Sequence, residues 1–114
     1  MENLNFALKG KKFTTKDLKI GNIQDLWQLR MALSGGTYGQ MYRTALKKSD
    51  EAMTIIDMTS FFTVFCPEVM ESLKPGSIRE LGLDDYLELR EVFVKDIQPW
   101  LESVENLLKR KEDE

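Results

Sequence analysis

Apolar residues recur every three to four positions along most of the chain, which is the spacing of one face of an α-helix. The first such segment begins at Asn22, an expected N-cap, and ends at the Ser34-Gly35-Gly36 turn. A second helix is expected from Thr37, which forms a capping box with Gln40, to the basic residues Lys47 and Lys48.

The most apolar segment runs from Ala52 to Cys66 and leaves only a narrow polar stripe, which includes Asp57. A helix that is apolar on nearly every side is usually the central one of a domain. Pro67 is expected to be the first residue of a following turn, which carries Val69, Met70 and Leu73 and comes before the Lys74-Pro75-Gly76 break. Ser77-Ile78-Arg79-Glu80 then resembles a second capping box, which predicts one helical turn ending at Gly82.

A long final helix is expected to begin at Asp84 and Asp85. Its apolar stripe continues across Pro99, so we expect a kink there rather than two helices. A helix of about 27 residues would be about 40 Å long, and part of it would extend beyond a small domain. The stripe consists of Tyr86, Leu89, Phe93, Ile97, Trp100, Leu101, Val104, Leu107 and Leu108.

The first twenty residues follow a different pattern. Phe6-Ala7-Leu8 and Phe13-Thr14-Thr15 flank the polar stretch Lys9–Lys12, which predicts a β-hairpin within residues 1–20. A lone hairpin is only marginally stable, so it must pack on the helices or on another chain. We therefore predict one mainly α domain over residues 1–114, with four to five helices, a short N-terminal β-hairpin and a charged, frayed tail at 109–114.

Composition narrows the possible functions. The net charge is −3, the pI is about 5.1, and the basic residues are scattered, so we expect no nucleic-acid partner. The longest uncharged stretch, Met58 to Pro67, is too short to cross a bilayer, and the N-terminus does not resemble a signal peptide. With a single cysteine, Cys66, a cytoplasmic location follows as the default expectation.

The residues that usually carry catalysis are scarce. The chain has no histidine, which removes the commonest general base and the commonest metal ligand. Cys66 lies in an apolar run, Gly35–Gly39 lacks a phosphate-loop ending, and Asp84-Asp85 suits a helix start. We therefore predict no enzyme activity, no cofactor and no metal site.

Asp57 is the exception in the apolar segment. It either lines the narrow solvent stripe, caps a helix or pairs with a basic residue such as Arg30, Arg43 or Arg79.

More apolar surface is present than one small domain can cover, which favours self-association or partner binding. Six methionines add adaptable apolar surface of the kind that accepts helical ligands. The candidate protein-binding residues are Phe61, Phe62, Phe65, Phe93, Trp100 and Leu101.

Three segments together resemble the tail assembly chaperones of long-tailed phages and prophages of Gram-positive bacteria. The resemblance covers about residues 20–108 and rests on an apolar helix closed by proline and a final helix with a Pro-Trp step. The segments are Ile56-Asp57-Met58 with Phe61 to Pro67, Leu81 to Tyr86, and Ile97-Gln98-Pro99-Trp100-Leu101.

This resemblance implies a mainly helical, self-associating protein that acts in the cytoplasm of the bacterial host. It would coat the tape measure protein, a very long helical chain with exposed apolar residues, until the major tail protein polymerises around it. The family's gene often also yields a longer frameshifted product, of which this chain would be the short form. A small helical regulator, either DNA-binding or of the anti-repressor type, remains the alternative, although no basic recognition helix stands out.

Overall fold

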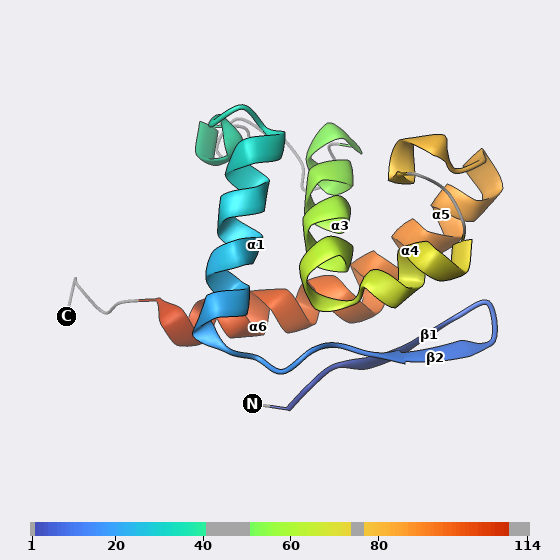
Figure 1. The fold of residues 1–114 in the computed structure, drawn as a ribbon, viewed down its shortest axis with the longest axis horizontal. Coiled ribbons are helices and arrows are strands. Elements are labelled where there is room, and N and C mark those ends of the chain that lie inside the picture. Colours follow the sequence, from blue (N-terminus) through green and yellow to red (C-terminus); the bar gives the residue numbers. More distant parts are fainter. Residues whose placement is uncertain (1, 41–50, 74–76, 110–114) are drawn as a thin grey trace.

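Helices form most of the chain in the computed structural model, which describes residues 2–40, 51–73 and 77–109 (Figure 1). Two N-terminal strands pair as an antiparallel hairpin, so the predicted mainly α fold with a short β-hairpin is confirmed. The elements are β1 (Asn5–Leu8), β2 (Lys11–Thr14), α1 (Ile20–Leu33), α3 (Glu51–Phe65), α4 (Pro67–Leu73), the 3-10 turn η1 (Ile78–Glu80), α5 (Leu83–Val92), the π-helical turn η2 (Phe93–Ile97) and α6 (Gln98–Leu108).

Three sequence predictions lie outside the described residues. They are the continuation of the second helix over 41–48, the break at 74–76, and the part of the charged tail at 110–114. Two predicted caps are wrong. Helix α1 begins at Ile20, so Asn22 lies inside it and donates from Nδ2 to the Asp17 carbonyl at 2.8 Å. Ser77 precedes η1 but makes no capping hydrogen bond with its side chain.

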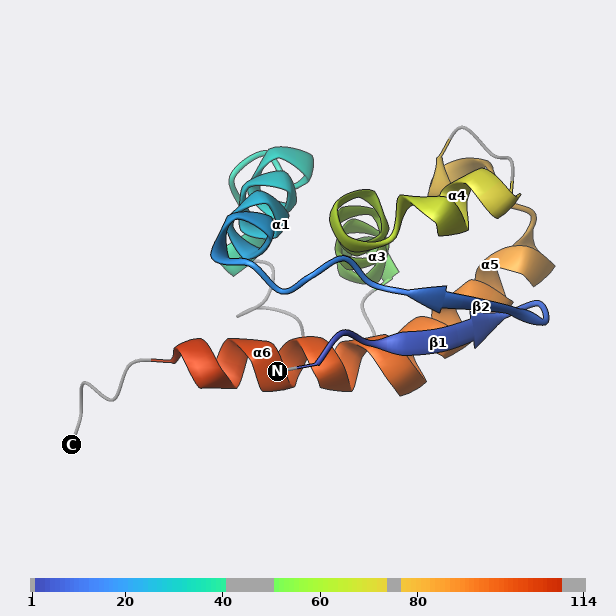
Figure 2. The same cartoon turned by 60° about the horizontal axis from the view of Figure 1, so that its bottom comes forward.

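The hairpin turns on Lys9 and Gly10, both of which have positive φ angles, 51° and 78°. This is the backbone that a two-residue hairpin turn requires, so β2 begins at Lys11, earlier than the sequence suggested. Phe6 and Phe13 face each other across the strands with ring centroids 5.7 Å apart. Figure 2 shows the hairpin beside α5 and α6, and its buried side chains join the helical core.

Helix α3 is the centre of the core. Its Phe61, Phe62 and Phe65 are at most 1% exposed and meet rings from the final helix. The hydroxyl of buried Ser60 donates to the Ile56 carbonyl at 2.7 Å, which satisfies that polar group inside the helix. One hydrophobic cluster includes residues from every element named above.

The final helical run continues from Leu83 to Leu108, as its apolar stripe predicted. A kink was expected at Pro99, and the structure has the π-helical turn η2 directly before α6. Pro99 has no N–H to donate to the preceding turn. In the wider π turn just before it, each backbone hydrogen bond spans one residue more than in an α-helix. Figure 1 shows α6 passing beneath α1 and α3.

Candidate functional site

Five of the six residues proposed as a protein-binding surface are buried. Phe61 and Phe62 are 0% exposed, and Phe65, Phe93 and Leu101 are at most 4% exposed. The expectation that they form surplus surface is therefore wrong. The physical reason is that α3 and the final helix cover each other, with the Phe61 and Phe93 ring centroids 6.2 Å apart.

The sixth residue, Trp100, is half-buried at the edge of the same cluster. Its ring packs edge-on against Phe61 and Phe65, with centroid distances of 6.3 and 5.9 Å. The indole Nε1 donates to the Glu2 carbonyl at 3.3 Å, so Trp100 also holds the N-terminal segment. Its main contribution is therefore structural.

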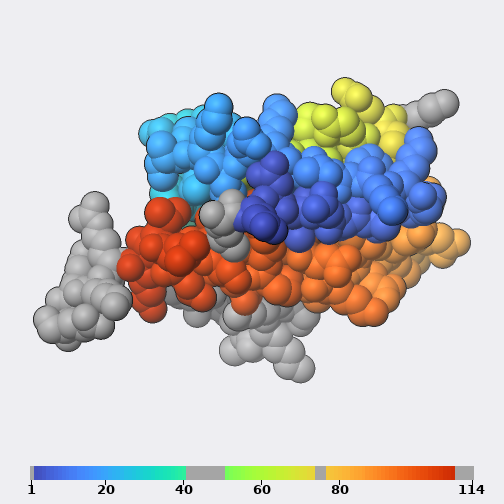
Figure 3. Space-filling view, turned by 90° about the horizontal axis from the view of Figure 1, so that it is seen from below, coloured from blue at the N-terminus to red at the C-terminus, as the bar shows by residue number. Residues whose placement is uncertain are grey.

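The exposed apolar side chains lie elsewhere. On α1, Trp27 is 40% exposed and Met31 is 46% exposed. At the end of α6, Leu107 is 73% exposed and Leu108 is 41% exposed. We call Trp27, Met31 and Leu108 the α1–α6 surface, and Leu107 with Leu108 the exposed end of α6. Figure 3 shows the C-terminal part of α6 beside α1.

A groove of about 430 Å³ joins the two helices of this surface. Trp27 and Met31 line it from α1, and Glu105 lines it from α6. Leu108 follows Glu105 by three residues and therefore lies on the same side of α6, one turn further along. The rest of the lining is Arg30, Tyr38 and Gly39. The groove thus combines exposed apolar walls with a polar base.

That base is a buried ionic cluster centred on Arg30, which is only 8% exposed. Its Nη1 donates to Glu105 Oε1 at 2.8 Å, and its Nε lies 3.3 Å from Asp57 Oδ1. The Nε–H is not directed at that oxygen, so the second contact is an ion pair without a hydrogen bond. The Tyr38 hydroxyl donates to Asp57 at 2.6 Å, and the Arg30 guanidinium lies 5.1 Å from the Tyr38 ring centroid.

The cluster joins α1, α3 and α6 and resolves the alternatives that the sequence left open for Asp57. Its partner is Arg30, while Arg43 lies outside the described residues. Burial raises the pKa of Asp57 above its ordinary value, although the Tyr38 hydrogen bond and Arg30 act in the opposite direction. Burial lowers the pKa of Arg30, but its three partners outweigh that effect and raise it overall. Arg30 therefore stays charged and holds the three helices together.

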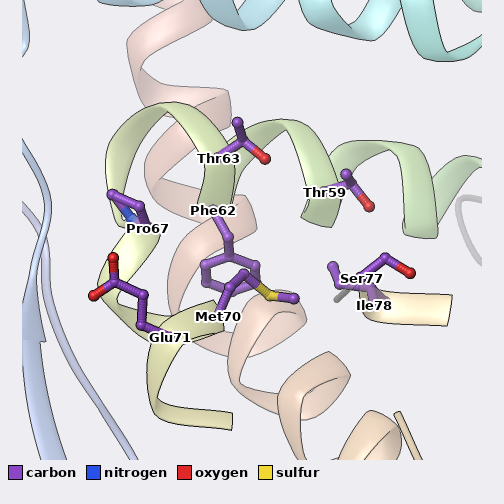
Figure 4. Close-up of a pocket in the computed structure, with 8 residues that line it drawn as sticks. All are labelled: Thr59, Phe62, Thr63, Pro67, Met70, Glu71, Ser77 and Ile78. Atoms are coloured by element: carbon purple, nitrogen blue, oxygen red, sulfur yellow. The ribbon is translucent and has the colours of Figure 1, made fainter. Parts of the chain in front are cut away.

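A second opening lies between α3, α4 and η1, with a volume of about 330 Å³ (Figure 4). We call it the α4 pocket. Phe62 and Ile78 form its buried base, and the Met70 side chain lies next to the Phe62 ring. The remaining lining residues are Thr59, Thr63, Pro67, Glu71 and Ser77.

The single cysteine is poorly suited to nucleophilic chemistry. Cys66 is 0% exposed, and burial together with the neighbouring Glu68 carboxylate raises the pKa of its thiol to about 12. The thiol is therefore protonated near neutral pH, whereas the thiolate is the reactive form. Cys66 packs as a small core residue, as its apolar sequence context predicted.

Metal and membrane signals are weak in the described part of the chain. Residues 2–40, 51–73 and 77–109 contain no group of three His, Cys, Asp or Glu side chains that could hold a metal ion. Asp85, one of the paired acids at the start of α5, forms an ion pair with Lys9. No single helix in these ranges is long and apolar enough to span a membrane, although Glu51–Phe65 and Pro67–Glu80, bent by 107°, pass that test as a pair.

Sequence reasoning missed the α1–α6 surface for an identifiable reason. Trp27 and Met31 belong to the same apolar segment, between Asn22 and Gly36, as Ile23 and Leu26, which are buried. On a helix of 3.6 residues per turn, Trp27 and Met31 lie on one side of that buried face rather than on it. The useful signal was the width of the apolar arc on this first helix, which is more than one packing contact can cover.

Comparisons with protein-family models, with curated proteins and with solved structures found no match for this chain.

Proposed function

We propose that this chain is a tail assembly chaperone of a long-tailed phage or prophage, which binds the tape measure protein and keeps it soluble in the cytoplasm of the bacterial host. The observation that carries the proposal is the α1–α6 surface, where Trp27 and Met31 remain exposed in the wall of an open groove and Leu108 is exposed one turn beyond its α6 wall. Exposed apolar residues beside a groove are typical of protein-binding sites. The sequence resemblance supplies the identity of the partner.

The groove suits an amphipathic helix. Such a helix lays its apolar face into a groove and uses side chains spaced three, four and seven residues apart as anchors. Trp27 and Met31 offer large apolar area, and methionine adapts to ligands of different shape. The tape measure protein would present many such helical segments along its length, so an adaptable surface suits it better than a specific pocket.

The ionic cluster gives the groove a rigid base. Arg30 pairs with Asp57 of α3 and with Glu105 of α6, so the two walls of the groove keep a fixed spacing. A preformed surface avoids the ordering cost that a flexible one meets on binding. In the proposed cycle, growth of the major tail protein around the tape measure protein then displaces the chaperone.

Self-association belongs to the same proposal. Several copies would coat one long helical partner, and each copy needs an apolar contact with its neighbours or with the partner. The exposed end of α6, where Leu107 is 73% exposed, extends past the core residues Leu101 and Val104 and is available for such a contact.

A regulator that binds DNA is the second candidate, and one observation favours it. Lys11, Lys12, Lys16 and Lys19 are exposed and make no ion pair with any described residue. They lie on the hairpin and the following loop, however, and not on a helix that could enter the major groove. Duplex binding that weakens steeply with added salt would support this candidate.

Co-expression with the long helical protein encoded just downstream tests the chaperone proposal. We expect the long protein to become soluble and to co-purify with the wild-type chain. Trp27→Asp should abolish both effects, because it places a charge in the apolar wall of the groove. Trp100→Asp is unsuitable for this test, since Trp100 packs against Phe61 and Phe65 and its loss would disturb the core.

Val94→Asp is the matched control. Val94 is 48% exposed, close to the 40% of Trp27, but it lies on η2 and not on the α1–α6 surface. It should leave solubility and co-purification unchanged. If the long protein stays insoluble with the wild-type chain, the chaperone function is wrong. If Trp27→Asp performs like Val94→Asp, the function stands and the α1–α6 surface is not the site.

A further inference from the structure

The α4 pocket is separate from the α1–α6 surface and has a different construction. Its base is apolar and closed, because Phe62 is 0% exposed and Ile78 is 3% exposed. Met70 and Pro67 are half-buried and form the apolar walls. The other described residues of the lining are polar, so the opening is apolar inside and polar at its edge: Thr59, Thr63, Glu71 and Ser77.

The size of the pocket limits what it can hold. Its volume of about 330 Å³ lies at the lower end of the range for ligand pockets, about 300 to 1,000 Å³. It is large enough for one bulky side chain and too small for a whole helix. Protein interfaces commonly place one large anchor residue in a pocket of this kind, and that anchor then contributes much of the binding energy.

Charge selects among the possible occupants. Glu71 is the single charged residue among the described residues of the lining, and it makes no ion pair with any of the residues that the structure describes. In Figure 4 its carboxylate lies beside Pro67 at the α4 side of the pocket. No lysine or arginine among the described residues lines the pocket, so the described part of its edge would attract a cationic group on the occupant.

We propose that the α4 pocket binds one apolar side chain from a helical segment of the partner, and that Glu71 pairs with a lysine or arginine about one turn away on that segment. The proposal rests on the chaperone function and deepens it, because it adds a charge requirement to binding. Residues three or four apart share one face of a helix, so an anchor and its cation reach the pocket together. The partner's segments would then be selected by sequence as well as by apolar character.

Charge reversal at Glu71 tests the proposal in the co-purification assay. Glu71→Lys should reduce the amount of partner recovered about tenfold, because it replaces an attractive contact with a repulsive one. Thr63→Trp should cause a similar loss by filling the mouth of the pocket from an exposed position on α3. Glu68→Lys is the control, since Glu68 lies on the same helix, carries the same charge and does not line the pocket.

Methionine methyl NMR locates the occupant directly. The chain has six methionines, of which Met70 lines the α4 pocket, Met31 lines the groove of the α1–α6 surface, and Met58 is 0% exposed in the core. We would label the methyl groups with ¹³C and add 25-residue peptides that tile the partner. Peptides with an apolar residue followed by lysine or arginine one turn later should shift Met70, and lysine-to-glutamate versions should bind about tenfold more weakly.

The outcomes separate the two proposals. If peptides shift Met31 but leave Met70 unchanged, and Glu71→Lys recovers as much partner as Glu68→Lys, the pocket proposal is wrong and the chaperone function stands. A Met70 shift that grows with the concentration of this chain alone would assign the pocket to a second copy and overturn the proposal. If the wild-type chain recovers no partner at all, both proposals are wrong.

Discussion

Helices α3 and α6 are both strongly apolar, yet one is buried on nearly every side and the other is only partly covered. Phe61 and Phe62 of α3 are 0% exposed, and rings from the hairpin and the final helix pack against them. Along α6, Leu101 is 4% exposed, whereas Leu108, seven residues later on the same face, is 41% exposed. The apolar stripe of α6 is longer than the neighbours that cover it.

This difference shows that the apolar residues of a helix can have two roles, one in the core and one at a binding surface. An all-round apolar helix marks the place where neighbouring elements converge, so its residues stabilise the fold. A one-sided stripe that continues past the last neighbour leaves apolar surface for a partner. The richest apolar segment of this sequence is therefore the wrong place to look for a binding surface, and the end of a long stripe is the better one.

The largest expected effect is on the α3 side of this comparison. Phe61→Ala should lower the free energy of unfolding by about 4 kcal/mol, because it leaves a cavity among buried rings. Phe61 has ring contacts with Phe62, Phe65, Phe93 and Trp100, so no single neighbour can fill the space. Urea unfolding followed by far-UV circular dichroism measures the change. A loss below about 1 kcal/mol would show that α3 is not the centre of the core.

The fold was largely predictable because local signals agreed with one another. The lysine–glycine turn, the apolar arc of residues 52–66 and the stripe across Pro99 each anticipated an element that the structure contains. The π turn at Phe93–Ile97 was not predictable, since proline indicates a disturbance of the helix but not its form. The cap at Asn22 failed because α1 begins earlier, at Ile20.

The binding surfaces were less predictable, because they depend on which elements meet in space. Burial of Phe93 and Leu101 follows from the packing of the final helix on α3, which periodicity alone does not reveal. The same holds for the pair Arg30–Glu105, whose members lie 75 residues apart. Asp57 needed a partner on chemical grounds, but its choice of Arg30 required the fold.

A smaller effect is expected at the ionic cluster that joins α1 to both helices. Arg30→Met should lower the free energy of unfolding by about 3 kcal/mol at pH 7, because it removes the cation and leaves the Asp57 carboxylate buried without a counter-charge. The Arg30→Met, Asp57→Asn double variant removes both charges and should recover much of that loss. Urea unfolding of the wild type, Arg30→Met, Asp57→Asn and the double variant completes the double-mutant cycle.

The loss of stability in Arg30→Met should also depend on pH, because it depends on whether Asp57 is charged. Burial holds the pKa of Asp57 above its ordinary value of 3.8, so the folded protein keeps a proton that the unfolded chain releases as pH rises past that value. The contribution of Asp57 to stability therefore falls as pH rises from 3.8 to the folded-state pKa. Without Arg30 that pKa rises further, so the deficit of Arg30→Met should be larger at pH 7 than near pH 4. If Arg30→Met lowers the free energy of unfolding equally at pH 7 and at pH 4, the raised pKa of Asp57 is not the cause.

The smallest effect on stability is expected at the free end of α6, where the comparison is sharpest. Leu101→Ala and Leu107→Ala make the same chemical change on the same helix, six residues apart. The first should lower the free energy of unfolding by about 2 to 5 kcal/mol, as for other buried leucines. The second should stay within about 0.5 kcal/mol of the wild type, because the Leu107 side chain is already in water.

Partner recovery should follow a different order. Leu107→Ala removes apolar area from the exposed end of α6, so we expect recovery of the co-expressed partner to fall about fivefold while stability is unchanged. Loss of recovery without loss of stability would identify the end of α6 as a binding element, because a structural role would change both. If recovery is also unchanged, the exposed end of α6 has no role in binding, and Trp27 and Met31 alone define the apolar walls of the groove.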